Sequence, residues 1–371
     1  MVVANNITEG ALDWAVVIPS NRTITPAFLE GIPEEVPIYV VDDSNGHVQS
    51  VRSRMVIFTY ADYERLLGHQ AHLVPRRSAA CRNFAYYYIA RETAHTHIVT
   101  LDDDCCTHAD FLAGHSVVGR TSTWTTVSSP MGWTNSIDLL PVPQPLYARG
   151  YPYWLRGDGV PQQTSESAAR SVCNVGLWKH HLDFDGMDKY VVDRYQTTFD
   201  FDPEQVMHRR IGLPEQPTLV PFSGMNVAFS RDLLSVMTQV PMNQQLGHDY
   251  YLWRFDDLWC GVIAQALINR RPEDCLTCGA PVVTHTRAGN LQREVAGEHY
   301  GHLLAPYFHD LVGEAATEID HDTYPAMYVA LCTAAAERAT KALERGALPR
   351  LYGRTLQAIF RHLRDWGTLF V

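Results

Sequence analysis

Short apolar runs that end in polar residues mark the first hundred residues of the chain. The runs Trp14–Pro19, Pro37–Val41 and Ile98–Leu101 have the length and the β-branched content of buried strands. A short helix is expected over Pro26–Leu29 and a longer one, with apolar residues at helical spacing, over Ala79–Arg91. The alternation of strands and helices predicts a parallel sheet with right-handed crossovers.

The pattern weakens after residue 110. Residues 111–220 are rich in Ser, Thr, Pro, Gly and aromatic residues without a clean period, so loops and short strands are expected there. A turn and strand follow over 222–231, helices over 232–238 and 259–269, and a last strand over 281–284.

The C-terminal part of the sequence predicts helices alone. Residues 324–344 are alanine-rich and helical, and Gly346 and Pro349 end that helix. An apolar stripe then marks one face of another helix: Leu356, Ile359, Phe360, Leu363 and Trp366. The stripe fits either the core or a contact between subunits, which makes a homo-oligomer possible.

Composition and charge restrict the class of protein. The 371 residues are 46% hydrophobic and 19% charged, and the net charge is −11 without any basic run. This balance argues against nucleic-acid and anionic-membrane partners, and no apolar stretch is long enough to span a bilayer. The first ten residues lack the basic start and apolar centre of a secretory signal, so we expect a cytoplasmic protein with reduced cysteines.

Three consecutive acids follow the apolar run that ends at Leu101. Asp102, Asp103 and Asp104 would repel one another unless a cation lies between them. In open α/β sheets the carboxyl ends of the strands bind ligands, and oxygen ligands together with phosphates suit Mg²⁺ or Mn²⁺. Asp102 and Asp104 are therefore candidate ligands for Mn²⁺ or Mg²⁺ and for a diphosphate. The alternative is a solvated turn that caps the next helix.

The first two predicted strands also end in polar loops at this edge. There a carboxylate or amide could bind the base or the ribose hydroxyls of a nucleoside. The second loop also has the composition of an ordinary turn, which is the alternative. The candidates in the two loops are Pro19, Asn21, Arg22, Asp42, Asp43 and Ser44.

Six segments together resemble the reversibly glycosylated polypeptide family, which includes UDP-arabinopyranose mutases of plants. They occur in the order of the family and extend over most of the chain. The segments are ACRNFAY (80–86), LDDDC (101–105), RGYPYWLR (149–156), GLW (176–178), GMNVAF (224–229) and RFDDLW (254–259).

The resemblance implies the fold class. It implies an α/β protein with a GT-A-like nucleotide-diphospho-sugar transferase fold, which is a Rossmann-like mixed sheet flanked by helices. The catalytic domain would cover residues 10–305, and residues 306–371 would form a helical C-terminal extension packed on it. It also implies a UDP-sugar substrate and a divalent metal, typically Mn²⁺.

The resemblance also implies roles for individual residues. Arg149 matches the arginine that is reversibly self-glycosylated in the family, and Arg156 matches a second arginine that supports activity. His285 lies where GT-A enzymes often place a third metal ligand. Asp256 and Asp257 lie where such enzymes place an acid on the acceptor side, although Asp also caps helices well.

The remaining candidates would contact the substrate. Arg287 has the planar guanidinium that suits a diphosphate, and Arg82 either approaches the phosphates or lies on a helix surface. The matching segments add further candidates for substrate binding: Asp102, Asp103, Trp178 and Asn226.

The function implied is that of a metal-dependent UDP-sugar mutase of the arabinopyranose/arabinofuranose type, or of a self-glycosylating transferase. Two alternatives remain: a retaining glycosyltransferase with a separate small-molecule acceptor, and a non-catalytic subunit that binds nucleotide sugars. The sequence departs from the plant pattern between Trp178 and Phe222 and in both nucleoside loops. It also has Ser223 where the plant proteins have a cysteine. These departures leave the sugar and the reaction open.

Overall fold

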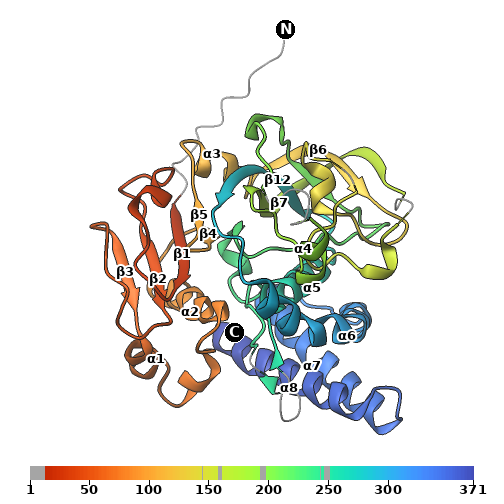
Figure 1. Ribbon diagram of the computed structural model, residues 1–371. Helices are drawn as coiled ribbons and strands as arrows, with labels where there is room; N and C mark the ends of the chain where they lie inside the picture. The colour runs from red at the N-terminus through yellow and green to blue at the C-terminus, as the bar shows by residue number, and fades with distance from the viewer. Residues whose placement is uncertain (1–12, 144, 158–160, 193–197, 243, 246–250) are drawn as a thin grey trace.

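A sheet of ten strands runs through the molecule (Figure 1). The computed structural model describes residues 13–371 except 144, 158–160, 193–197, 243 and 246–250. The strand order is β3-β2-β1-β4-β9-β7-β6-β8-β12-β5. The strands are β1 (Trp14–Ser20), β2 (Ile38–Asp42), β3 (Met55–Phe58), β4 (His97–Leu101), β5 (Cys105–Cys106), β6 (Thr121–Ser128), β7 (Gln163–His180), β8 (Arg209–Ile211), β9 (Asn226–Ser230) and β12 (Asp274–His285). Two short strands, β10 (Gln244–Gln245) and β11 (Tyr251–Leu252), form a separate two-stranded antiparallel sheet.

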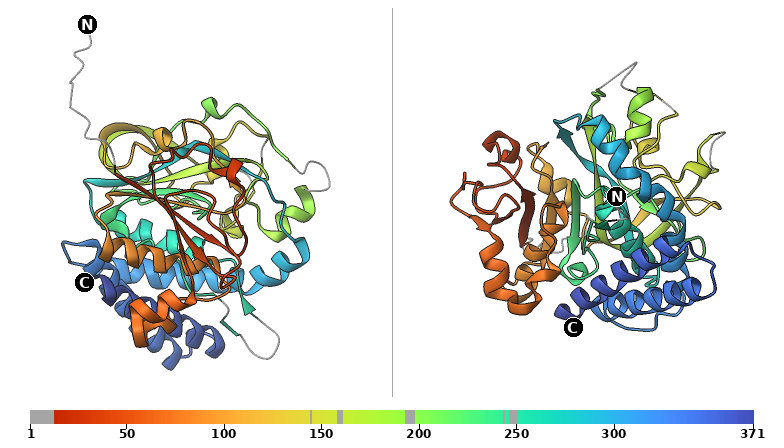
Figure 2. Two further views of the ribbon diagram at one scale, coloured as in Figure 1. Left: turned by 90° about the vertical axis from the view of Figure 1, so that its left-hand side faces the viewer. Right: turned by 60° about the horizontal axis from the view of Figure 1, so that its bottom comes forward.

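Helices flank the sheet, and most of them lie below it in Figure 1 and in the left view of Figure 2. This mixed α/β architecture with C-terminal helices confirms the predicted fold class and is consistent with a GT-A-like fold. The helices are α1 (Tyr60–Leu67), α2 (Asn83–Glu92), α3 (Phe111–His115), α4 (Gly186–Val192), α5 (Asp256–Ile268), α6 (Leu291–Ala316), α7 (Tyr324–Glu344) and α8 (Arg350–Gly367). Among the helices of the described residues, none is both long and apolar enough to cross a membrane.

The directions of the strands explain why several polar loops meet at one edge. Strands β1, β2, β3 and β4 are parallel, β9 is antiparallel to both β4 and β7, and β12 is parallel to β7. Strands β1, β2, β4, β7 and β12 therefore all end at the same edge of the sheet. The acids at 102–104 follow β4 there, and His285 is the last residue of β12.

Strand β7 corrects the prediction of loops and short strands over residues 111–220. It has 18 residues and pairs with β6, β9 and β12. Because β6 also pairs with β8 and β8 with β12, the strands β6, β7, β12 and β8 form a closed ring. The first half of β7 is polar and mostly exposed, so it lacks the apolar run by which strands are recognised.

Two further helices differ from expectation. The helix predicted over 232–238 is wrong: that stretch contains the end of the 3-10 turn Arg231–Leu233 and hydrogen-bonded turns over 234–237. Its continuation is buried, and the amide of Gln239 donates to Asn83 Oδ1 (2.8 Å) rather than to a helical carbonyl. Helix α6 was not anticipated, because Gly297, Gly301 and Pro306 weaken its helical pattern.

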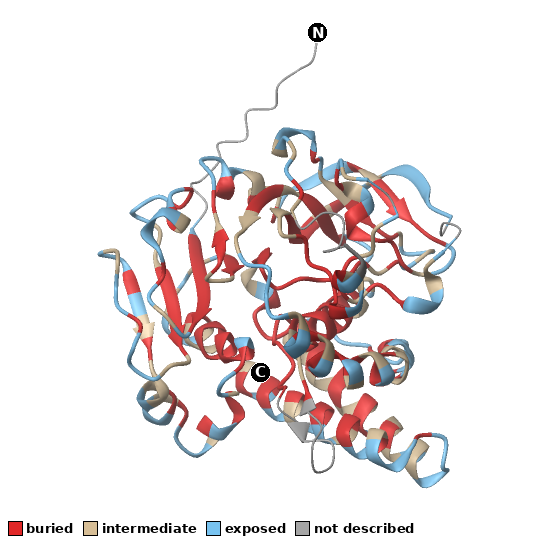
Figure 3. Ribbon diagram, in the orientation of Figure 1, coloured by how far each residue is buried: buried red, intermediate tan, exposed pale blue. Residues whose placement is uncertain are grey.

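The C-terminal helices belong to the same core as the sheet. Helix α7 has the predicted bounds, and the stripe on α8 is buried, with Trp366 only 1% exposed. One cluster of buried side chains extends from β1 to α8. Figure 3 shows buried residues, in red, both in the sheet and in the C-terminal helices. The proposed boundary between residues 305 and 306 falls within α6, so the division into domain and extension stays a prediction; its residues 10–12 lie outside the described residues.

Candidate functional site

A cavity of about 880 Å³ lies at the carboxyl edge of the sheet, and we call it the strand-end cavity. It is lined by the loops that follow β4, β7 and β12 and by the first turns of α5 and α6. Eight of the residues singled out from the sequence line it: Arg82, Asp102, Asp104, Arg149, Asp256, Asp257, His285 and Arg287.

Asp102 is bound by a buried arginine. Arg82 Nη2 donates to Asp102 Oδ1, while Arg82 Nη1 donates to Thr100 Oγ1 (2.6 Å) and to the carbonyl of Gly224 (2.8 Å). Burial raises the pKa of Asp102 above its ordinary value, more than the charge of Arg82 lowers it. Arg82 is 1% exposed, so it is not the helix-surface arginine of the alternative interpretation.

Asp104 faces two basic side chains. Arg287 Nε donates to Asp104 Oδ2 (2.7 Å), and His285 Nε2 lies 3.8 Å from the same oxygen. Burial alone would raise the pKa of Asp104, but His285 and Arg287 hold it well below its usual range. His285 Nδ1 lies 2.8 Å from the carbonyl oxygen of His181, which directs Nε2 towards Asp104.

The predicted metal ligands have suitable chemistry but are not gathered around one point. Two carboxylates and an imidazole suit Mn²⁺. In this structure, however, Asp102 is bonded to Arg82 and Asp104 to Arg287, so a metal would compete with both arginines. Metal binding by Asp102, Asp104 and His285 therefore stays a prediction.

The metal-type groups that do lie together in the described part of the chain are Asp185, Glu298 and His302, whose ligand atoms are within 4.8 Å of one another. Arg156 Nη2 already donates to Asp185 Oδ2 (3.0 Å), and Arg254 Nε to Glu298 Oε1 (2.7 Å). Two guanidinium groups at these carboxylates disfavour a cation there.

Arg149 lies in the strand-end cavity, held by two carboxylates. Its Nε donates to Asp183 Oδ1 (2.9 Å), and its Nη1 and Nη2 donate to the two oxygens of Asp257 (3.1 and 2.7 Å). Nη1 also donates to the carbonyl of Arg254 (2.6 Å). Burial opposes the charge of Arg149, but Asp183 and Asp257 raise its pKa well above the ordinary value.

The backbone on both sides fixes this arrangement. The amide of Arg149 donates to the carbonyl of Asp183 (2.7 Å). Gly150 has φ +88°, and a Cβ there would lie 2.7 Å from Leu258, so the turn after Arg149 needs glycine. Asp257 also accepts from the amide of Gly224 (3.0 Å), which ties the loop before β9 to the same carboxylate.

Asp256 is the neighbouring acid on the cavity wall. It begins α5 and is partly buried. Burial, with the charge of Asp257 adding to it, raises the pKa of Asp256 to about 6. A carboxyl group with such a pKa exchanges a proton near neutral pH.

Arg156 does not line the strand-end cavity. Its guanidinium pairs with Asp185 (3.0 Å) and Asp188 (2.8 Å) and lies over the ring of Tyr153 (3.7 Å). These contacts hold the 149–156 segment against the loop after β7, so Arg156 supports Arg149 from outside the cavity.

The residues predicted to contact the nucleoside lie beside the cavity rather than on its wall. The carboxylate of Asp42 accepts from the amides of Ser44, Gly46 and Val48 (2.8, 2.7 and 3.2 Å) and so shapes its own loop. Asp43 accepts from the amide of Arg77 (2.6 Å), and Arg77 does line the cavity.

The loop after β1 binds the middle acid of the trio. Asp103 accepts from Ser20 Oγ (2.6 Å) and pairs with Arg22. Asp103 does not line the cavity, and neither do Pro19 and Asn21, although Arg287 on the cavity wall lies 3.8 Å from Asp103 Oδ1. The contacts of this loop with a nucleoside stay predictions.

Trp178 and Asn226 are buried between strands. Trp178 is 2% exposed within β7. Asn226 Nδ2 donates to the carbonyls of Leu177 (3.0 Å) and Pro281 (2.9 Å), which joins β9 to β7 and β12. Neither side chain lines the strand-end cavity, so their contacts with a substrate stay predictions as well.

Several charged residues of the wall were not singled out from the sequence. Lys189 Nζ donates to Glu294 Oε2 (2.7 Å), and Arg254 lies 3.4 Å from Glu294 Oε1. Asp183, as described, holds Arg149. The sequence offered one signal for this residue, the two acids in Asp183-Phe184-Asp185. Because neither β7 nor α6 was anticipated, the sequence did not indicate that these acids lie at the cavity.

Comparison with known proteins shows the family of this chain. Residues 43–340 match the family model described as reversibly glycosylated polypeptide. Probable UDP-arabinopyranose mutase 4 of Arabidopsis thaliana is 25% identical over 344 residues, which cover 89% of this chain and 85% of that protein. UDP-arabinopyranose mutase 2 of the same plant is 27% identical (70% of this chain, 68% of that protein), and UDP-arabinopyranose mutase 1 of Oryza sativa subsp. japonica is 24% identical (77% and 72%). The match covers most of the chain, including Arg149 and the acids that surround it, and the chain therefore belongs to the reversibly glycosylated polypeptide family.

Proposed function

We propose that the chain is a UDP-sugar mutase that interconverts the arabinopyranose and arabinofuranose forms of UDP-arabinose. The observation that carries the proposal is the position of Arg149, which lies in one cavity with Asp102 and Asp104. The names of the related plant proteins supply the substrate class.

The cavity has groups for both ends of the bond between sugar and nucleotide. Arg82 and Arg287 can bind the diphosphate, and Asp102, Asp104 and His285 would hold Mn²⁺ or Mg²⁺ once these two arginines turn from the carboxylates to the phosphates. When bound, the metal would act as a Lewis acid that stabilises the negative charge of the departing diphosphate. Asp183 and Asp257, which accept hydrogen bonds from Arg149, can receive protons at the sugar end.

Arg149 would accept the sugar during ring interconversion. The bond between C1 and the diphosphate oxygen breaks, and a bond between C1 and Arg149 Nη2 forms. The proton lost from Nη2 passes to Asp257 Oδ2, which lies 2.7 Å away. While the sugar is attached at C1, its ring can open and close through another hydroxyl, after which UDP takes it back by the reverse step.

A retaining glycosyltransferase is the second candidate function, and Asp256 favours it. Its pKa of about 6 suits a group that takes the proton from an acceptor hydroxyl. We prefer the mutase to the glycosyltransferase because Arg149 occupies the part of the cavity wall where a separate sugar acceptor would have to bind.

Incubation of the protein with UDP-arabinopyranose and Mn²⁺, followed by chromatography of the nucleotide sugars, tests the proposal. UDP-arabinofuranose should form, and the double variant Asp102→Asn with Asp104→Asn should lose at least about a hundredfold in rate. The exposed control Asp320→Asn should keep full activity.

Other outcomes would contradict the mutase. Transfer of arabinose to an added acceptor without UDP-arabinofuranose would support the glycosyltransferase. Binding of UDP-arabinose, measured by calorimetry, without any conversion would instead support a non-catalytic nucleotide-sugar-binding subunit. An unchanged rate after addition of a chelator would remove the metal from the proposal.

A further inference from the structure

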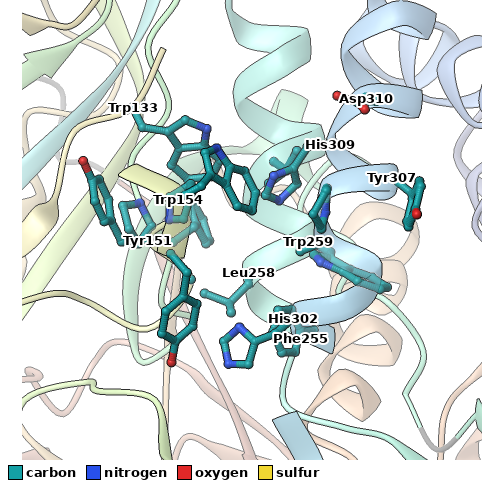
Figure 4. A pocket seen from close by; sticks show the side chains of 18 of the residues that line it. Trp133, Tyr151, Trp154, Phe255, Leu258, Trp259, His302, Tyr307, His309 and Asp310 are labelled. Carbon is teal, nitrogen blue, oxygen red and sulfur yellow. The ribbon is translucent and has the colours of Figure 1, made fainter. Parts of the chain in front are cut away.

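A second cavity, of about 490 Å³, lies behind the segment that carries Arg149. Arg149, Asp256 and Asp257 line the strand-end cavity, whereas the next residues in each segment, Gly150 and Leu258, line this one. We call it the aromatic pocket, because rings from the 151–154 segment, from α5 and from α6 surround it (Figure 4). The rings labelled in Figure 4 include Trp133, Tyr151, Trp154, Phe255, Trp259, His302, Tyr307 and His309.

The rim of the aromatic pocket leaves large apolar side chains in water. Trp154 is 58% exposed, Leu303 41% and Tyr153 39%. Water at such surfaces is displaced favourably by a ligand with an apolar face. Flat indole and phenol rings, in particular, favour a ligand whose own face is flat and presents C–H groups.

The wall also contains buried polar atoms without partners among the described residues. They are Trp259 Nε1, His302 Nε2 and His309 Nδ1. Each of these atoms has lost its hydrogen bonds to water, which destabilises the protein while the atom stays unsatisfied. Burial lowers the pKa of His309 to about 4, so this ring is neutral at pH 7 and offers one N–H and one lone pair.

The charges of the wall exclude an anionic ligand. Among the described residues, no Arg or Lys side chain lines the pocket, and the charged residue of the lining is Asp310. A phosphate or a nucleotide sugar would meet no cation there and would be repelled by that carboxylate. The ligand of this pocket therefore differs from the UDP-sugar proposed for the strand-end cavity.

We propose that the aromatic pocket is a second binding site that takes an uncharged saccharide. A sugar ring presents C–H groups on its faces, which pack on Trp154 and the neighbouring rings. Its hydroxyl groups both donate and accept, so they can satisfy the indole N–H of Trp259 and the imidazole of His309 once the side chains that cover these buried atoms turn aside. A purely apolar ligand of the same size would leave these atoms unsatisfied. The site does not depend on the proposed function.

Saturation-transfer NMR with four probes tests the site: methyl β-D-glucopyranoside, methyl β-D-xylopyranoside, methyl α-L-arabinofuranoside and cellobiose. At least one should bind with a dissociation constant in the range of about 1–10 mM, with or without saturating UDP. Trp154→Ala should weaken its binding about fivefold or more, because the variant removes the exposed ring of the platform. Tyr190→Ala is the matched control, since Tyr190 is an aromatic residue of similar exposure (55%) outside this pocket, and it should bind like the wild type.

His309→Phe separates a saccharide from an apolar occupant. The variant keeps a ring but removes the nitrogen atoms, so saccharide binding should weaken about threefold or more, whereas the uncharged apolar dye N-phenyl-1-naphthylamine should bind at least as well. Three results would overturn the proposal: no binding of any of the four probes, equal binding by the Trp154→Ala and Tyr190→Ala proteins, or loss of probe binding when UDP is added. Binding of the dye without any saccharide would assign the pocket to an apolar ligand instead.

Discussion

Arg149 can accept a sugar only if it gives up a proton, and its surroundings decide where that proton goes. The guanidinium is fully charged, because Asp183 and Asp257 raise its pKa. Four of its N–H groups donate to these acids and to the carbonyl of Arg254. The second N–H of Nη2 has no acceptor among the described residues, so this nitrogen is the one that can face a sugar.

Incubation with UDP-glucose and Mn²⁺ should therefore add one hexose to the protein, on the peptide that contains Arg149. Arg149→Ala should abolish the adduct and leave the affinity for UDP largely intact. Arg156→Ala should slow turnover but keep the attachment site, because Arg156 lies outside the cavity. Peptide mapping by mass spectrometry measures both effects, and a hexose on any other residue would contradict the assignment.

Asp256 makes the stability of the protein depend on pH. Its pKa is about 6 in the folded protein, against an ordinary value of 3.8. Between these values the unfolded chain ionises while the folded protein keeps its proton, so stability falls as the pH rises from about 4 to 6. Asp256→Asn should remove this loss and raise the free energy of unfolding by about 3 kcal/mol at pH 7.5 but not at pH 3.5.

Urea unfolding at the two pH values measures this effect. The exposed control Asp320→Asn should give the wild-type difference between the two pH values. An equal gain for Asp256→Asn at both pH values would show that the carboxyl group is not buried in its neutral form.

At the scale of elements, α6 holds together the two segments that position Arg149. Glu298 on α6 accepts from the amide of Gly186 through Oε2 (2.6 Å) and from Arg254 Nε through Oε1 (2.7 Å). Gly186 follows the Asp183 loop, and the carbonyl of Arg254 accepts from Arg149. Arg254 has φ +61°, a strained conformation for a residue with a side chain, so this carbonyl needs external support.

Glu298→Gln should lower kcat about tenfold and change KM for the UDP-sugar little. The carboxylate of Glu298 accepts from two donors, the amide of Gly186 and Arg254 Nε. A glutamine amide has only one oxygen, and its NH₂ group would face the other donor. One of the two hydrogen bonds is therefore lost, and Arg149 shifts. Glu314→Gln, on the same helix but in an exposed pair with Arg338, should leave kcat unchanged. Equal kcat values for the two variants in steady-state kinetics would show that α6 does not position Arg149.

At the scale of the whole molecule, the C-terminal helices and the sheet share one core. Trp366 on α8 packs near Tyr87 on α2 (ring centroids 6.1 Å apart), and Arg91 Nη2 donates to the carbonyl of Leu369 (2.6 Å). The buried cluster that contains Trp366 also contains the strands. The C-terminal helices should therefore unfold together with the sheet.

Trp366→Ala should lower the free energy of unfolding by about 3–5 kcal/mol and keep a single transition in urea, the same by fluorescence and circular dichroism. Arg361→Ala, on the exposed side of the same helix, should change it by less than about 0.5 kcal/mol. A second, earlier transition in the Trp366→Ala protein would show that residues 306–371 form a separate cooperative unit.

The sequence alone determined the elements that carry a local pattern. Strands β1, β2 and β4 are short apolar runs, and α7 is an alanine-rich run between clear stop signals. The acids after β4 were recognisable because charge follows the strand abruptly. The parallel order of the first strands then placed these acids at the ligand edge, which needed no knowledge of tertiary contacts.

Other parts of the site were decided only by tertiary structure. Arg149 meets Asp183 and Asp257, which lie 34 and 108 residues further along the chain. Strand β7 and helix α6, which bring these groups together, have mixed patterns because each contacts several different neighbours along its length. A local pattern reports the period and the ends of an element, whereas the pairing of charges across such distances follows from how the elements pack. The sequence therefore determined which chemical groups stand at the strand ends, and packing alone decided that Arg149 lies between two carboxylates.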